Sequence, residues 1–138
     1  MTMLSAMKIS SSAMTAQMVR MNTTASNLAN MDVVGSSPEL AYKAKKPIFS
    51  TVLEKFTEED YQASVKIAGI AQTSRPNVRR YEPQNPAANE EGYVYQSNVN
   101  SIEEMVEMTN ASRSYQTNVE VMNATKKMMM ATLQLGKG

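Results

Sequence analysis

The chain contains no cysteine and no histidine. Without cysteine there can be no disulfide framework and no thiolate metal site. Without histidine the commonest general base and the commonest metal ligand are missing, so the serines lack the partner that would activate a nucleophile. There is also no glycine-rich loop of the kind that holds phosphate. The sequence therefore predicts a protein that is not an enzyme and that holds no cofactor or metal ion.

A strong charge of either sign is also missing. Lys and Arg number 14 and Asp and Glu number 13, which gives a net charge of +1. This balance argues against an electrostatic grip on nucleic acid. The longest apolar run is far shorter than the roughly 20 residues that a membrane helix needs, and the N-terminus lacks the apolar core of a cleavable signal peptide. We expect no transmembrane segment, no nucleic-acid partner and no small-molecule substrate.

Methionine and proline are separated along the chain. All 13 methionines fall within residues 1–31 or 105–130, and all five prolines fall between these two stretches. Helix breakers and β-favouring residues are thus kept away from both ends. We predict a mainly α chain with a small β-rich insert of short strands and loops at residues 32–100. Residues 1–31 and 101–138 are predicted to pair as a coiled-coil-like helical hairpin that forms one discontinuous core domain.

The C-terminal segment has apolar residues at alternating spacings of three and four, which is typical of a helix that buries one stripe against a partner helix. Ser101 and Glu104 fit the S-x-x-E capping box, so the helix is predicted to begin near Ser101. Gly136 stands where its end is expected. Ser112 and Lys126 also fall on the stripe, and Lys126 would have to extend to solvent or pair across subunits. The other predicted contact residues are Met105, Met108, Tyr115, Val119, Met122, Met129 and Leu133.

The N-terminal segment from about Leu4 to Asn30 has no proline or glycine and repeats the same spacing. Its predicted contact residues are Leu4, Met7, Met14, Met18, Met21, Ala25 and Leu28. A methionine stripe is most often core, and the flexible thioether tolerates varied neighbours. The segment carries only two charges, Lys8 and Arg20, whereas an ordinary surface helix has a charged outer face. Two interpretations remain: a mediocre helix at a frayed end, or a helix covered on several sides within an assembly.

The middle segment shows the signals of several short strands. One of them is interrupted by Pro47, which favours an edge position, and another changes phase near Gly69, which predicts a bulge there. The acidic stretch Phe56–Tyr61 is predicted to be a charged loop. The predicted strands are Tyr42–Leu53, Ala63–Ala71, Val78–Tyr81 and Tyr93–Val99.

Several runs of residues resemble the axial proteins of the bacterial flagellum. The first helix ends with S-N-L-A-N, the second is preceded by Asn98–Asn100, and the resemblance extends over nearly the whole chain. The run A-S-R-S-Y-Q-T-N in the second helix, together with the short middle segment, narrows the resemblance to the proximal rod proteins. The motif residues are Ser26, Asn27, Leu28, Ala29, Asn30, Arg113, Tyr115, Gln116 and Asn118.

This resemblance implies a structural role. Family members leave the cell through the flagellar export apparatus without a cleaved signal and polymerise into the rod, the periplasmic drive shaft that transmits torque. Their terminal helices form the inner core of a tube, and the region after S-N-L-A-N joins a β-rich layer with neighbouring subunits. The partners that it implies are sister copies, other rod proteins and the adaptor that joins the rod to the membrane ring.

Two other classes of protein are compatible with parts of the sequence. A self-contained coiled-coil adaptor or export chaperone would show strongly charged outer helix faces, which residues 4–30 lack. A membrane-surface protein would need a basic face on an amphipathic helix, for which two charges are too few. Because ordering long helices is costly for a chain of this length, we also expect the terminal helices to be weakly structured in the free chain and to order on polymerisation.

Overall fold

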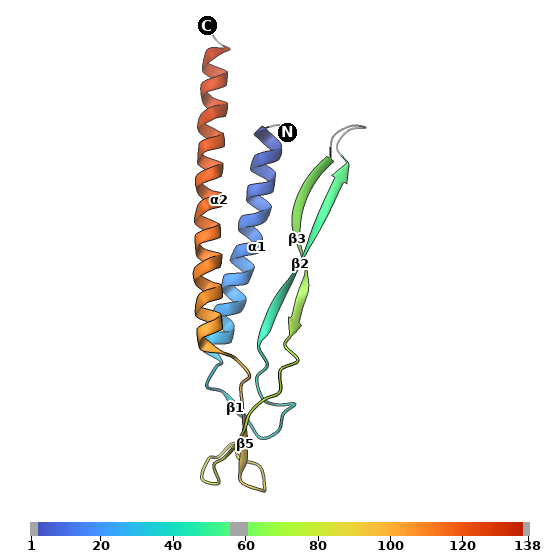
Figure 1. The fold of residues 1–138 in the computed structure, drawn as a ribbon, viewed down its shortest axis with the longest axis vertical. Coiled ribbons are helices and arrows are strands. Elements are labelled where there is room, and N and C mark those ends of the chain that lie inside the picture. The colour runs from blue at the N-terminus through green and yellow to red at the C-terminus, as the bar shows by residue number, and fades with distance from the viewer. Residues whose placement is uncertain (1–2, 56–60, 137–138) are drawn as a thin grey trace.

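The computed structural model describes residues 3–55 and 61–136. Helix α1 spans Met3–Ala29 and helix α2 spans Ser101–Leu135, and the two lie side by side (Figure 1). Of the predicted acidic loop Phe56–Tyr61, residues 56–60 lie outside the described residues, and Tyr61 is the first residue of a strand instead. The chain is therefore mainly helical, with a small β-rich insert between two terminal helices that pack together, as the sequence predicted.

The start of α2 differs from the predicted capping box. Asn100 is the N-cap, and its side-chain oxygen accepts hydrogen bonds from the backbone N–H groups of Ile102 and Glu103 at 3.0 and 3.3 Å. Ser101 is thus already inside the helix, and Glu104 is buried instead of capping it. The prediction of an S-x-x-E box was wrong because the asparagine before Ser101 is the N-cap and satisfies two orphan donors of the first turn. The helix ends at Gly136, as predicted.

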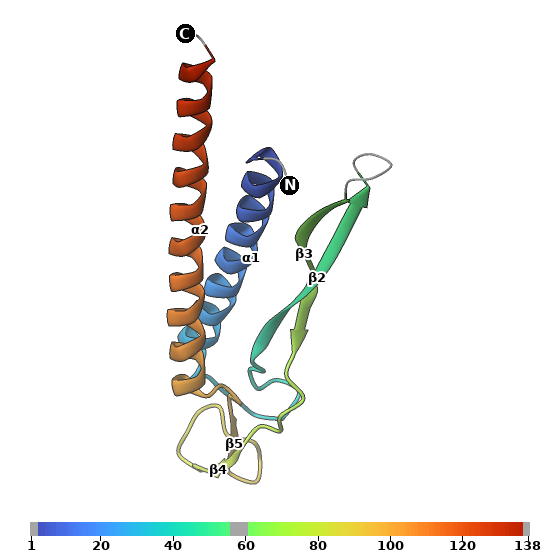
Figure 2. The same cartoon turned by 45° about the horizontal axis from the view of Figure 1, so that its top comes forward.

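A long antiparallel hairpin lies along α1 on the side away from α2 (Figures 1 and 2). It consists of β2, Lys45–Lys55, and β3, Tyr61–Gln72. The register shifts between Ile48 and Phe49, which pair with Gly69 and Ile67 and leave Ala68 as the extra residue. The bulge is therefore adjacent to the glycine at which the sequence predicted it.

A second, smaller sheet lies at the end of the molecule away from the C-terminus of α2 (Figures 1 and 2). Its antiparallel strands run in the order β1-β5-β4, and Val94 in the middle strand is fully buried. Strands β4 and β5 match two predicted strands, whereas β1 has two residues and was not predicted as a strand. The bounds are Val34–Gly35 for β1, Arg79–Tyr81 for β4 and Tyr93–Gln96 for β5.

The interior of the described chain contains little apolar volume. Its buried polar residues outnumber its buried apolar ones, and the largest side chains that are fully buried are those of Val94 and Asn27. The buried apolar residues are Ala16, Ala41, Ala44, Val94 and Ala111. Since apolar burial is the main favourable term in folding, such an interior provides little stability to the chain on its own.

Gly35, in β1, allows the connector between β1 and β2 (residues 36–44) to pass close to this strand, and this predicts the effect of a substitution. A Cβ at this position would lie 2.7 Å from the backbone nitrogen of Ala41 and 2.9 Å from the carbonyl carbon of Leu40. Because these atoms are backbone, β1 or the connector must move, and we expect Gly35→Ala to destabilise the small sheet by about 1–3 kcal/mol. Urea unfolding followed by the near-UV circular dichroism of the sheet tyrosines measures this loss.

Gly69 provides the matched control. A Cβ there meets nothing within 4 Å, so Gly69→Ala should change the free energy of unfolding by less than about 0.5 kcal/mol. Equal unfolding midpoints for the two variants would contradict the close approach at Gly35.

Candidate assembly interface

Helix α1 lies between two other elements, with α2 on one side and the β2–β3 hairpin on the other (Figure 2). The positions that stay exposed beyond Met3 form one narrow stripe with spacings of three and four. They are Leu4, Lys8, Ser11, Thr15, Met18, Asn22, Ala25 and Ala29. The low charge of this helix follows from its position, because most of its circumference is already covered within one chain.

The predicted contact residues of α1 lie at the edge of the buried face. Leu4 and Met18 are 68% and 47% exposed, and Ala25 is also exposed. Met7, Met14, Met21 and Leu28 are half-buried. The buried positions are instead small or polar, namely Ser5, Ser10, Ala16, Thr23, Thr24 and Asn27. As a seam within one chain the predicted stripe is therefore displaced, because small side chains occupy the positions of closest approach.

On α2 part of the predicted stripe lies on the covered face, and two buried residues lie one position before stripe residues. Met108, Tyr115, Met122 and Met129 are half-buried, as is Val119. Between them the buried residues are Ala111 and Thr125, where the sequence predicted Ser112 and Lys126. Lys126 is exposed, so the covered face of α2 carries no charge at that position. Met105 and Leu133 are 54% and 61% exposed, so within one chain they are not part of the seam.

Asn27, from the S-N-L-A-N run, lies at a junction of three segments and has no exposed surface. Its Oδ1 accepts hydrogen bonds from the Lys45 N–H at 2.9 Å and from the Tyr42 hydroxyl at 3.0 Å. Its Nδ2 donates to the Lys45 carbonyl at 2.8 Å and to Glu104 Oε2 at 3.0 Å. An amide offers two donors and two acceptor sites, so its hydrogen-bonding capacity is fully used. We call Asn27, Tyr42, Lys45 and Glu104 the Asn27 junction.

The other motif residues have lesser roles in the structure. Asn30 Nδ2 donates to the Ser26 carbonyl at 2.7 Å and closes the end of α1, while Ala29 is exposed. Asn118 Nδ2 donates to the Ser114 carbonyl at 2.8 Å within α2. Arg113 and Gln116, also on α2, are exposed. Ser26 Oγ lies 3.4 Å from the Tyr42 hydroxyl, so of the residues that the resemblance grouped, Ser26 and Asn27 reach the junction.

Asn98 joins the insert to the start of α2 in a similar way. Its Oδ1 accepts a hydrogen bond from the Ala44 N–H at 2.6 Å, and its Nδ2 donates to the Arg75 carbonyl at 2.6 Å. Asn98 is 7% exposed, so these bonds are shielded from water. Side-chain amides therefore fix both the beginning of β2 and the segment that follows β3.

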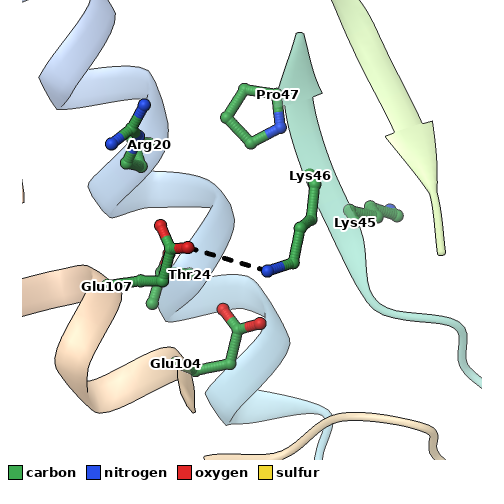
Figure 3. Close-up of a pocket in the computed structure, with 7 residues that line it drawn as sticks. All are labelled: Arg20, Thr24, Lys45, Lys46, Pro47, Glu104 and Glu107. Carbon is green, nitrogen blue, oxygen red and sulfur yellow. Dashed lines mark ion pairs between the residues drawn. The ribbon is translucent and has the colours of Figure 1, made fainter.

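A cavity of about 150 Å³ lies beside the junction (Figure 3). Lys46 Nζ lies 3.7 Å from Glu107 Oε1, and both side chains are nearly half exposed, so this ion pair contributes little stability. Among the described residues there is no group of three carboxylate, histidine or cysteine side chains that could hold a metal ion. The cavity residues are Arg20, Thr24, Lys45, Lys46, Pro47, Glu104 and Glu107. Among them, Lys46 and Glu107 form the ion pair drawn in Figure 3, and Arg20 and Lys45 lie over the rings of Phe49 and Tyr42.

Two carboxyl groups near the small sheet, one exposed and one half-buried, also have structural partners. A hydrogen bond with the Asn85 side chain lowers the pKa of Glu82, and one with Ser37 lowers the pKa of Glu39. Both groups stay ionised at neutral pH and are thus poor general acids.

Many large apolar side chains of α2 are exposed. This helix extends beyond the N-terminal end of α1, so its last turns have no neighbour among the described residues (Figure 1). Ile102 is 72% exposed at one end and Leu135 is 83% exposed at the other. The exposed large apolar residues of α2 are Ile102, Met105, Val106, Val121, Met128, Met130, Leu133 and Leu135. Exposed apolar surface of this extent is typical of a protein–protein interface.

Comparison with known proteins identifies the family. Residues 7–35 match the family described as flagella basal body rod protein, and residues 90–135 match the flagellar basal body rod FlgEFG protein C-terminal family. These two segments contain most of α1 and nearly all of α2.

Full-length relatives carry the name flagellar basal-body rod protein FlgC. The Escherichia coli O157:H7 protein is 42% identical, and 99% of this chain aligns with 100% of that protein. The Salmonella typhimurium protein is 41% identical and the Bacillus subtilis protein 37% identical, each over 99% of this chain and 100% of the relative. The chain therefore belongs to the FlgC family of flagellar basal-body rod proteins.

Proposed function

We propose that the chain is a structural subunit of the flagellar proximal rod, in which it polymerises through its terminal helices into the shaft that transmits torque. The observation that carries this proposal is the distribution of apolar side chains. Among the described residues, five apolar residues are buried whereas twenty large ones are exposed. A protein that functioned alone would bury them, so the exposed apolar side chains are available for neighbouring subunits.

The energies involved support assembly. Burying a fully exposed large aliphatic side chain contributes about 1.5–3 kcal/mol, so covering the four most exposed ones on α2, which are already partly buried, would contribute about 4–8 kcal/mol. The whole stability of a small domain is about 5–15 kcal/mol. Contacts with neighbours can therefore contribute as much stability as the interior of the chain does.

Residues 1–31 and 101–138 act together as the core of the subunit, and residues 32–100 form the insert that contacts neighbours. The polymer contacts include the predicted residues that are exposed on the two helices, Leu4, Met18, Ala25, Met105 and Leu133. The half-buried methionines Met7, Met14, Met21, Met108, Met122 and Met129, with Leu28, Tyr115 and Val119, border the same surfaces. Their flexible side chains suit contacts with non-identical neighbours.

The partners are sister copies, other rod proteins and the adaptor between the rod and the membrane ring. The chain reaches the periplasmic space through the flagellar export apparatus without a cleaved signal. No helix in the described part of the chain is long and apolar enough to cross a membrane. A self-contained coiled-coil adaptor or export chaperone is not favoured, because the exposed stripe of α1 carries Lys8 as its one charged residue among the described positions.

Circular dichroism of the purified chain tests the dependence on neighbours. Since so little apolar surface is buried, the free chain at micromolar concentration should show much less helix than the 27 and 35 residues of α1 and α2. It should also lose this helix over a broad temperature range. A full helical signal with sharp thermal unfolding would contradict the proposal that the helices order on assembly.

Deletion of residues 4–14 tests the role of the first helix. It removes three turns of α1, including Leu4, Met7 and Met14, so we expect swimming to be lost while the protein is still made in the cytoplasm. Swimming in soft agar and an immunoblot of the cytoplasmic fraction measure the two effects, with the intact chain from the same plasmid as control. Normal swimming by the deletion strain would exclude the first helix from assembly.

A further inference from the structure

The side chain of Asn27 takes the place of a neighbouring strand at the beginning of β2. It accepts from the N–H and donates to the C=O of the same residue, Lys45. A residue in an adjacent antiparallel strand exchanges hydrogen bonds with its partner in this way. Lys45 is the first residue of β2. The end of α1 is therefore hydrogen-bonded to the first residue of the hairpin, at the open edge of that strand.

The same amide also bonds to the other helix. The second hydrogen of Nδ2 is donated to the Glu104 carboxylate in the first turn of α2, and Glu104 is only 4% exposed. Turning the amide by half a rotation would place its N–H groups against the Lys45 N–H and its oxygen against the Glu104 carboxylate. Glu104 and Lys45 therefore require the same orientation of the amide.

Beyond the junction the hairpin is held less closely. The Val65 N–H donates to Ser12 Oγ at 3.2 Å, and the Arg20 guanidinium lies 4.8 Å from the centre of the Phe49 ring. A cavity of about 260 Å³ separates α1 from the hairpin in this region, and the Gln17 Oε1 atom beside it is buried without a hydrogen-bond partner. A two-stranded hairpin is marginally stable by itself, so its placement depends strongly on the anchor at Lys45.

We propose that Asn27 is a positioning residue that couples the pairing of α1 and α2 to the placement of the β2–β3 hairpin. When α2 docks, its Glu104 carboxylate fixes the amide in the orientation that binds Lys45. When α2 is apart, the amide loses this constraint and holds the hairpin less firmly. The consequence for assembly, which rests on the proposed function, is that the hairpin is presented to neighbours only by chains whose terminal helices have paired.

A set of substitutions tests the coupling. Asn27→Asp keeps both acceptor sites, removes both donors and sets a carboxylate against Glu104. Adding Glu104→Gln supplies an N–H that can donate to the carboxylate introduced at position 27, which restores this bond with the opposite polarity. The matched control adds Glu107→Gln instead, because Glu107 lies one turn further along α2 and pairs with Lys46. This control removes the same charge without creating a donor beside position 27.

A cysteine cross-link reports the position of the hairpin. The chain has no cysteine of its own, so Ser12→Cys with Val65→Cys reports one contact, about 15 residues along α1 from the junction and thus roughly 22 Å away. In intact cells under mild oxidation, the pair should cross-link readily in the otherwise unchanged chain. N27D should lower the ratio of docked to undocked hairpin about tenfold. Relative to N27D, N27D/E104Q should raise the ratio of docked to undocked hairpin about threefold. Recovery is incomplete because the Lys45 carbonyl still lacks its donor. N27D/E107Q should leave the ratio as low as in N27D.

Three results would overturn the coupling. They are failure of the unchanged chain to cross-link, full cross-linking in N27D, and equal recovery by the two double variants. Swimming of the same variants without the cysteines tests the assembly consequence separately, and it should follow the same order. If cross-linking follows that order while every variant swims normally, the coupling is established and its role in rod assembly is refuted.

Discussion

Hydrogen bonds between buried side chains and distant backbone hold this chain together, in place of a large apolar core. Asn27 is fully buried and connects α1, the connector, β2 and α2, and Asn98 joins two further segments. Such bonds contribute a net stability of only about 0.5–1.5 kcal/mol each, but an unpaired member of the network would cost more. The polar interior therefore specifies how the elements are arranged more than it stabilises them.

This constraint explains the surface of the subunit. Because polar groups fill the interior, the methionines, leucines and isoleucines of the terminal helices are left partly or fully exposed. The second helix is longer than the first, and in the part of the chain that the structure describes its residues 130–135 are exposed. The chain belongs to a family of rod proteins, and a subunit that lies between neighbours can bury these residues on assembly.

The sequence predicted the large features correctly because they depend on local chemistry. Proline and methionine are separated along the chain, and this separation indicated both helices and the insert. The errors arose where contacts between residues far apart in the sequence determine the structure. The stripe on α2 was chosen by hydrophobicity, whereas Ala111 and Thr125 are buried because small residues let the helices approach. Glu104 resembled a capping residue, but it bonds to Asn27, which is 77 residues away in sequence. Only the resemblance pointed to Asn27, and no spacing rule predicts such a contact.

A map of the assembled basal body at side-chain resolution tests the central claim most directly, namely that neighbours supply the apolar burial that this chain lacks. We expect adjacent subunits to cover Leu4, Met18, Ile102 and Leu133, and Asn27 to keep its bonds to Lys45 and Glu104. A map in which these apolar side chains face solvent, while the subunits meet through other surfaces, would contradict this claim.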